Sequence, residues 1–262
     1  MDLQLNGKTA LVTAASAGLG YATAAALSAE GARVALCSRD LTRAQDAAAR
    51  IQASSGHEVL AFQADVASED DLTRLFGEVA AAFGSLDILV CNAGGPPPGN
   101  FSALGEVQWA TAFQLTLMSV VRSVRLAVPL MQAGGGGRIL TILSSSVRKP
   151  IDNLTLSNTF RPAVHGLCKS LSTELAPLNI QVNGLAPGRI ETERINQLDD
   201  AQAEKRGLSR AEVRAASERQ IPMGRLGQPQ EFGQVAAFLC SPVASYVNGS
   251  VLLVDGGAVT SL

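Results

Sequence analysis

Apolar runs of strand length alternate along this chain with alanine-rich segments that carry apolar residues at helical spacing. In residues 40–53, for example, Leu41, Ala44, Ala48 and Ile51 recur every three or four positions. Such alternation is typical of βαβ units and predicts an α/β fold, a doubly wound parallel sheet with helices on both faces. We expect about seven strands, at residues 9–13, 33–37, 59–63, 86–91, 138–143, 180–185 and 251–254.

The length and composition of the chain indicate one domain over residues 1–262. Its 262 residues, 47% of them hydrophobic, are enough for one large core, and no repeat or interdomain linker interrupts them. One segment differs, because residues 190–221 are polar and follow Pro187 and Gly188. This segment is either a solvated pair of helices or a substrate lid over the carboxyl ends of the strands, where open α/β sheets bind ligands. We favour the lid.

Charge and cysteine content argue against several classes of protein. Lys and Arg total 21 against 23 for Asp and Glu, and the net charge of −2 gives no field that would attract nucleic acid or an anionic membrane. The first residues lack a basic segment followed by an apolar one, and no apolar run approaches the length of a membrane span, so we expect a cytoplasmic protein. The four cysteines are widely spaced, which favours buried thiols and no metal site.

The first expected strand leads into a turn that contains Gly18 and Gly20 and then into a helix. The first amides of a helix have no partner within it and lie at its positive end, so a phosphate can bind there if no Cβ blocks its approach. Ala14 stands where a third glycine would complete the G-x3-G-x-G spacing, and alanine restricts the backbone more than glycine does. The turn residues that we expect at the cofactor are Thr13, Ala15, Ser16, Gly18, Leu19 and Gly20.

The second strand ends at Ser38 and Arg39, twenty residues after Gly18 (38 − 18 = 20). At that place a dinucleotide fold carries the group that recognises the adenosine ribose, and an Asp or Glu there would repel a 2′-phosphate. A neutral serine followed by an arginine, whose planar fork suits a phosphate, favours NADP(H) over NAD(H). The alternative is an ordinary solvated arginine at a strand end.

Three further segments follow predicted strands at the same edge of the sheet. Asp65 and Val66 follow the third strand, where the carboxylate can bond the adenine or merely cap a helix. Small residues after the fourth strand let the backbone approach a ribose, and the turn after the sixth strand can offer amides to a carboxamide. Each alone could be turn chemistry, but their coincidence supports a cofactor site. The residues concerned are Asn92, Ala93, Gly94, Pro187, Gly188, Ile190 and Thr192.

With these residues in place, the chain resembles the short-chain dehydrogenase/reductase family over nearly its whole length. Residues 13–20 resemble the family's Thr-Gly-x3-Gly-x-Gly, and residues 91–94 its Asn-Asn-Ala-Gly. Residues 221–229 and 255–257 are similar to those of the 3-oxoacyl-carrier-protein reductase branch. The resemblance implies a single-domain Rossmann-type fold, a nicotinamide cofactor, a small carbonyl or alcohol substrate, and commonly a homo-oligomer, a tetramer or a dimer.

The chain departs from the family at the catalytic positions. Members carry an Asn, a Ser and a Tyr-x3-Lys pair, in which the tyrosine passes a proton to the substrate oxygen and the lysine lowers the pKa of that tyrosine and holds the ribose. The motifs at 138–139 and 166–171 align without a gap, and only the serine is retained. In the order Asn, Ser, Tyr, Lys the corresponding residues are Thr116, Ser144, Ser157 and Arg161.

These replacements change what the site can do. A serine hydroxyl is several units less acidic than a phenol, whose pKa is about 10, so Ser157 is a poor proton donor near neutral pH. Arg161 can bond a ribose or an anion, but a guanidinium stays protonated and cannot relay a proton. Other groups that we considered as donors or helpers are Tyr21, Tyr246, His57, His165, Ser145 and Ser146.

We expect an NADP(H)-dependent oxidoreductase that transfers hydride to or from a carbonyl carbon and is slow on common ketones. Hydride delivery mainly requires positioning, which an intact cofactor site supplies. One alternative is a non-catalytic nucleotide-binding protein, a sensor or an assembly subunit. Another is a cofactor-independent lyase, since relatives that eliminate halide carry arginine at the lysine position, although they keep the tyrosine and lose the glycine turn. A group of cations near the expected cleft favours an anionic substrate, namely Arg148, Lys149, Arg189 and Arg194.

Overall fold

The computed structural model describes residues 1–261 and contains one parallel sheet in the order β3-β2-β1-β4-β5-β6-β7. The expected α/β fold and its seven strands are confirmed, with shifts of a few residues at their ends. The order reverses direction between β1 and β4, which places a crevice at the carboxyl ends of these two strands. The strands are β1 (Thr9–Val12), β2 (Arg33–Ser38), β3 (Val59–Gln63), β4 (Ile88–Cys91), β5 (Gly137–Ile142), β6 (Ile180–Pro187) and β7 (Val251–Val254).

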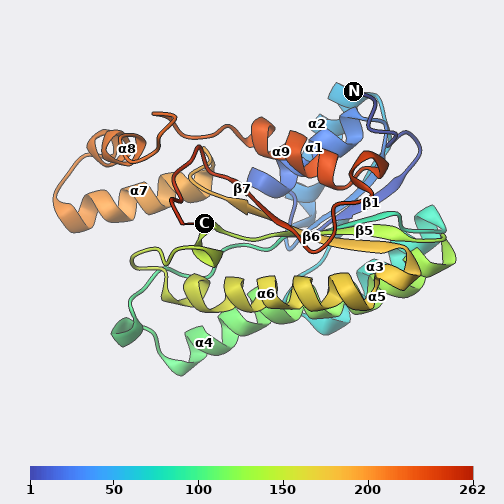
Figure 1. The fold of residues 1–262 in the computed structure, drawn as a ribbon, viewed down its shortest axis with the longest axis horizontal. Helices are drawn as coiled ribbons and strands as arrows, with labels where there is room; N and C mark the ends of the chain where they lie inside the picture. Colours follow the sequence, from blue (N-terminus) through green and yellow to red (C-terminus); the bar gives the residue numbers. More distant parts are fainter. Residues whose placement is uncertain (262) are drawn as a thin grey trace.

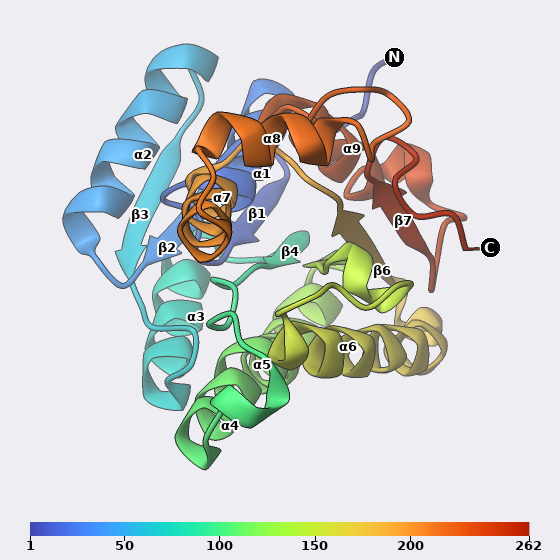
Figure 2. The ribbon, with the colours of Figure 1, turned by 90° about the vertical axis from the view of Figure 1, so that its left-hand side faces the viewer.

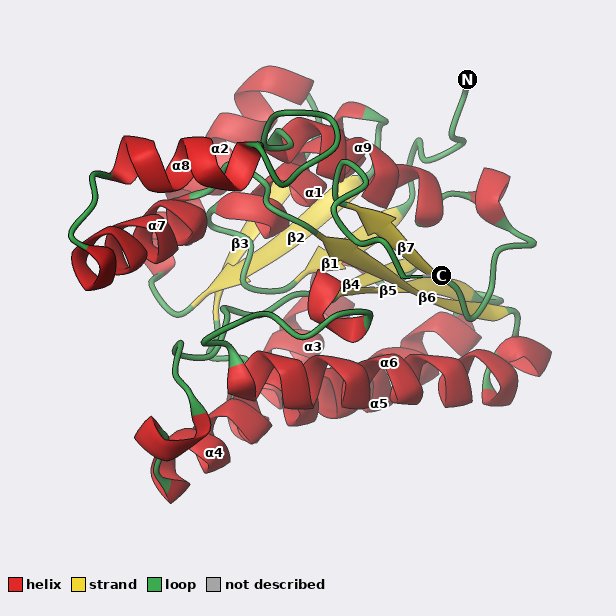
Figure 3. Ribbon diagram, turned by 60° about the vertical axis from the view of Figure 1, so that its left-hand side comes forward, coloured by secondary structure: helices red, strands yellow, loops and turns green. Residues whose placement is uncertain are grey.

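Helices cover both faces of the sheet, as Figures 1 and 3 show. Side chains alternate along each strand, so that Leu11 packs into one core while its neighbours Ala10 and Val12 pack into the other. One face is covered by α1 (Gly18–Ala29), α2 (Leu41–Ser55) and α9 (Pro229–Leu239), and the other by α3 (Glu69–Phe83), α5 (Ser119–Ala133) and α6 (Thr155–Glu174). The central strands β1 and β4 are therefore buried from both sides, which explains their continuous apolar sequences, whereas the edge strands β3 and β7 are partly exposed.

The longest helical segment was not anticipated. Helix α4 (Glu106–Phe113) continues through a π-helical turn, η2 (Gln114–Met118), into α5, and the whole segment spans 28 residues. By length and composition this helix could cross a membrane, so the expectation that no run approaches that length is wrong. Buried helices of soluble proteins meet the same criterion, and α5 packs here against α3, β4 and β5.

The polar segment 190–221 forms two helices, α7 (Glu193–Arg206) and α8 (Arg210–Glu218), which pack on each other. They follow β6 directly and therefore start at the carboxyl edge of the sheet. Figure 2 looks onto this side and shows α7 and α8 in front of the strands. The remaining short turns of helix are η1 (Phe101–Ala103), η3 (Ser145–Val147), η4 (Ala176–Leu178) and η5 (Pro242–Ala244).

Candidate active site

The loops after β1 and β4 are bound together by side chain to backbone hydrogen bonds. The Thr13 hydroxyl donates to the carbonyl of Asn92 at 2.6 Å and accepts from the amide of Asn92 at 2.9 Å. The side-chain amide of Asn92 in turn donates to the backbone carbonyl of Ala14 at 2.9 Å. These bonds join loops that lie almost eighty positions apart in sequence, so the edge where the two strands end is held in a defined shape.

The glycine turn leaves room for a phosphate at the start of α1. A Cβ on Gly20 would lie 2.5 Å from the Asn92 side-chain nitrogen, so this position accepts no side chain. Gly18 adopts a φ of +59°, and a Cβ there would meet only the Thr192 side chain, at 3.8 Å or more. Ala17 precedes the helix and makes no side-chain cap, and the first turn contains no acidic residue. The amides at this helix start can therefore serve an external anion, and the cradle fits a dinucleotide.

Ala14 adopts a left-handed backbone conformation with a φ of +48°, at the position where the family's motif has glycine. We expect Ala14→Gly to raise the free energy of unfolding by about 0.5 kcal/mol, because relief of about 1–2 kcal/mol of strain exceeds the added entropy of the unfolded chain. Urea unfolding measures this. Ala17→Gly is the matched control, because Ala17 is exposed with a φ of −157° and should gain nothing. A lower stability of Ala14→Gly would contradict the strain.

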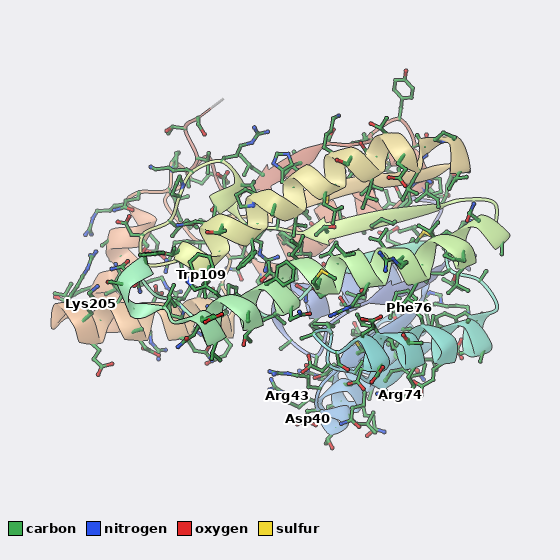
Figure 4. The ribbon with its side chains drawn as sticks, turned by 90° about the horizontal axis from the view of Figure 1, so that it is seen from below. Asp40, Arg43, Arg74, Phe76, Trp109 and Lys205 are labelled. Atoms are coloured by element: carbon green, nitrogen blue, oxygen red, sulfur yellow. The ribbon has the colours of Figure 1, made fainter. Side chains whose placement is uncertain are left out.

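At the adenosine end, two hydroxyls face each other and no acidic residue ends β2. The Ser16 hydroxyl donates to the Ser38 hydroxyl at 3.2 Å, and Arg39 follows with an exposed side chain. Asp40 then caps α2 by accepting from the amide of Arg43, and Figure 4 labels this pair at the start of the helix. Ser38 thus lies beside the glycine turn, and the exposed Arg39 is the next residue along the chain.

Asp65 takes part in the turn that follows β3. Its carboxylate accepts from the amide of Ala67 at 2.9 Å, and its own amide donates to Asp71 at 2.8 Å. Asp65 therefore does not cap α3, whose N-cap is Ser68, but holds the turn that precedes this helix. Val66, beside it, is buried in the core.

The loop after β6 closes the same edge. The amide of Gly188 donates to Val254 at 2.9 Å, and a Cβ on Gly188 would lie 2.5 Å from the Asp255 side chain, so glycine is required there. Ile190 is buried, and Thr192 caps α7 by accepting from the amide of Ile195. The Thr192 methyl group faces Gly18, so the start of α7 reaches the glycine turn. The predicted cofactor residues after β1, β4 and β6 thus share one edge of the sheet.

Two of the expected catalytic residues, Ser144 and Ser157, belong to a cluster of hydroxyls, and a third, Arg161, is a buried cation one helical turn after Ser157. The Ser157 and Ser146 hydroxyls lie 3.4 Å apart, both buried, and the Ser144 hydroxyl accepts from the amide of Ser146 at 3.1 Å. Arg161 donates to the carbonyl of Ile142 at 2.6 Å. No carboxylate among residues 1–261 lies within 4 Å of its guanidinium. Burial lowers the pKa of Arg161 to about 10, so this cation stays charged at neutral pH.

Thr116 lies in the π-helical turn that packs against α6. Its side chain is buried, and within the described residues its hydroxyl has no hydrogen-bond partner. A buried hydroxyl without a partner costs free energy, so this atom can accept a further group such as a water molecule. The sequence carries no sign of the π turn, because the residues of this segment are also compatible with a regular helix.

The other titratable groups considered from the sequence do not supply the missing phenol. Tyr246 is fully exposed, and the ring of Tyr21 lies under the Arg50 guanidinium at 4.9 Å from its centroid. Partial burial and the charge of Arg148 lower the pKa of His165, so this histidine is neutral at pH 7.

The cations expected at the cleft have different surroundings. Arg189 donates to Asp199, a fully buried carboxylate on α7, and Arg214 of α8 donates to the same carboxylate at 3.0 Å. Arg189, one of the cations predicted at the cleft, is therefore paired with a carboxylate of α7. No local motif marks Asp199, whose partners lie 10 and 15 positions away. Arg148 and Lys149 are exposed.

The parallel sheet and the glycine turn at its edge define a dinucleotide-binding fold of the Rossmann type. A family model described as "Enoyl-(Acyl carrier protein) reductase" matches residues 13–259. The 7alpha-hydroxysteroid dehydrogenase of Escherichia coli is 34% identical over 261 residues, which cover 100% of this chain and 98% of that protein. The 3-oxoacyl-[acyl-carrier-protein] reductase of Aquifex aeolicus is 32% identical over 259 residues, which cover 98% and 99%. The chain therefore belongs to the short-chain dehydrogenase/reductase family.

Solved structures agree with this assignment. L-sorbose reductase from Gluconobacter frateurii, complexed with NADPH and L-sorbose, superimposes with a TM-score of 0.95 at 32% identity, over 100% of both chains. A 7 alpha-hydroxysteroid dehydrogenase complexed with NADH and 7-oxo glycochenodeoxycholic acid gives a TM-score of 0.90 at 34% identity, over 100% of this chain and 98% of that one. The protein is thus an oxidoreductase of a family that uses nicotinamide cofactors, and relatives of comparable similarity bind either NADPH or NADH.

Proposed function

We propose that this protein is an NADP(H)-dependent oxidoreductase that acts on a small carbonyl or alcohol compound without a catalytic tyrosine. The observation that carries the proposal is the intact cofactor edge, in which the open glycine turn and the Ser16–Ser38 hydroxyl pair lie together beside Arg39. Calorimetric titration with NADPH tests it. If no heat of association is detected with NADPH or NADH, the proposal is wrong.

The cofactor, when bound, supplies or accepts the hydride, and the chain's own residues prepare the other reactant. Ser144 can donate its hydroxyl to the substrate oxygen, since in the structure this group accepts only from the amide of Ser146. The Arg161 guanidinium is held by Ile142 and has further N–H groups for the ribose hydroxyls. Its fixed charge stabilises negative charge on a nearby oxygen but transfers no proton. Proton transfer then falls to water or to the ribose hydroxyls, so we propose slow turnover of common ketones.

The preference for NADP(H) rests on Arg39 and can be tested there. We expect Arg39→Ala to weaken NADPH binding about 10- to 100-fold, the usual worth of a charge-assisted hydrogen bond, and to leave NADH binding unchanged. Arg50→Ala is the control, because Arg50 lies over the ring of Tyr21 instead. Both affinities are measured by fluorescence titration. An unchanged ratio of the two affinities in Arg39→Ala would show that Arg39 does not read the phosphate.

A second candidate is a non-catalytic nucleotide-binding protein, a sensor or an assembly subunit. It is favoured by one observation, that Ser157 and Arg161 replace the family's proton relay while the cofactor edge is kept. Tight NADPH binding without turnover of any carbonyl or alcohol would support it. The lyase alternative is disfavoured, because the relatives with that activity have lost the glycine turn that this chain retains.

We also propose that the protein is cytoplasmic and assembles as a homo-oligomer, a tetramer or a dimer. All four cysteines are buried and unpaired, which suits a reducing compartment. Around α4, Phe101, Val107 and Phe113 are exposed, and they adjoin an edge-to-face pair of Trp109 and Phe160. An apolar face of this kind is consistent with burial against another subunit. Light scattering of the purified chain measures its oligomeric state.

A further inference from the structure

The segment that we propose as a lid, together with Arg189 just before it, contains three arginines whose side chains are partly buried, and only two of them are neutralised. Arg189 and Arg214 both bind the carboxylate of Asp199, and Arg214 also contacts Glu191 at 3.2 Å. Arg194 differs. Among residues 1–261, no carboxylate lies within 4 Å of its guanidinium. In a segment where buried cations are otherwise paired, this one is left without a counterion.

The unpaired guanidinium lies over the cofactor edge. Arg194 donates to the carbonyl of Pro96 at 2.8 Å, and its guanidinium lies 3.4 Å from where a Cβ on Gly95 would be. Two residues earlier, the methyl group of Thr192 faces Gly18. The first turn of α7 therefore spans the crevice between the glycine turn after β1 and the loop after β4. Arg194 lies at the β4 end of this crevice. Its neighbours there are Gly95 and Pro96, the residues that follow Asn92–Gly94 in the chain, on the side where we expect the nicotinamide and the substrate.

The partly buried charge of Arg194 is unfavourable in free energy, and a bound anion would stabilise it. Burial lowers the pKa of this arginine, but a guanidinium remains protonated at neutral pH. A partly desolvated cation without a partner is unfavourable, and a guanidinium offers five N–H donors, of which Pro96 takes one. The planar fork of a guanidinium matches the two oxygens of a carboxylate. Because Pro96 holds the side chain in place, little further ordering is needed when an anion binds.

We propose that Arg194 forms a carboxylate-binding subsite of the active site and that the substrate is a small carbonyl or alcohol compound bearing a carboxylate. The inference rests on the proposed oxidoreductase function and adds the residue that selects the substrate. The inference also distinguishes Arg194 from the other cations predicted at the cleft. Arg189 is neutralised by Asp199, and Arg148 and Lys149 are exposed.

The test compares carboxylates with their neutral amides on the NADPH-loaded protein. The probes are acetoacetate and hexanoate, each paired with its primary amide, and binding is followed by calorimetry and by the fluorescence of bound NADPH. We expect at least one carboxylate to bind about 10- to 100-fold more tightly than its amide, as for one charge-assisted contact. No preference for either carboxylate overturns the proposal, and this comparison needs no variant.

Variants then assign the preference to Arg194. Arg194→Met should abolish it without changing the affinity for NADPH, Arg194→Lys should keep part of it, and Arg206→Met, at an exposed arginine of the same helix, should keep all of it. A preference that survives in a folded Arg194→Met protein overturns the proposal. So does a loss of NADPH affinity in that variant with the preference retained, because Arg194 would then serve a cofactor phosphate. Failure of the underlying function is separate, since it appears as an absence of NADPH binding in the parent protein.

Discussion

A double variant that combines Ser157→Tyr with Arg161→Lys is expected to reduce acetoacetyl thioesters at least about 100-fold faster than the parent chain, which is the lower end of what a positioned proton donor contributes. The reason lies in the cluster at the end of β5. Ser157 faces Ser146 at 3.4 Å, and Arg161 is a fixed cation, so the site as we propose it can hold an oxygen but offers no side chain that titrates near neutral pH as its proton donor. Tyrosine and lysine would restore a titratable relay beside Ser144, which is already present.

The measurement is kcat/KM with NADPH between pH 6 and 9, for the parent, both single variants and the double variant. The parent should show no ionisation in this window, because Arg161, with a pKa of about 10, stays charged throughout. The double variant should gain one, with activity falling as the pH rises through the pKa of the new phenol, because only the protonated phenol can donate. Arg161→Lys alone should gain nothing, since it introduces no proton donor. An equally slow double variant with normal NADPH affinity would show that more than the relay is missing.

Asp199→Asn is expected to loosen helices α7 and α8, the segment that we propose as a lid. Asp199 is fully buried and is the common acceptor of Arg189 and Arg214, so its loss leaves two partly buried cations without their shared anion. Removing one partner of a buried ion pair costs about 3–5 kcal/mol, and we take about 3 kcal/mol because both arginines keep some access to water. At about 1.4 kcal/mol per factor of ten, amide hydrogen exchange in α7 and α8 should accelerate about 100-fold.

The neighbouring residue provides the matched control. Asp200 pairs with Arg210 at the surface, where water and salt screen the interaction, so Asp200→Asn should leave the exchange rates of both helices unchanged. Exchange in the central strands should also be unchanged in both variants, since the ion pairs lie in the lid. Equal exchange rates in Asp199→Asn and Asp200→Asn would mean that the buried carboxylate does not hold the lid.

Local patterns in the sequence were enough for the architecture and for most of the cofactor edge. The alternation of strands and helices depends on apolar spacing within short segments, and the glycine turn depends on the absence of side chains at fixed neighbouring positions. For this reason the seven strands and the gathering of the β1, β4 and β6 loops at one edge could be predicted. The π turn between α4 and α5 could not, because its residues are equally compatible with a regular helix.

By itself the sequence determined the parallel sheet and the glycine turn, because both depend on residues that are neighbours in the chain. That Ser157 and Arg161 stand at the family's tyrosine and lysine positions stays a prediction. Only the tertiary structure decided how the charges pair: Asp199 binds Arg189 and Arg214, whereas Arg194 lies beside Pro96 with no carboxylate of residues 1–261 within 4 Å. Residue types and short-range spacing can be seen directly in the sequence. The pairing of a buried charge cannot, because it depends on partners that folding brings together from distant positions.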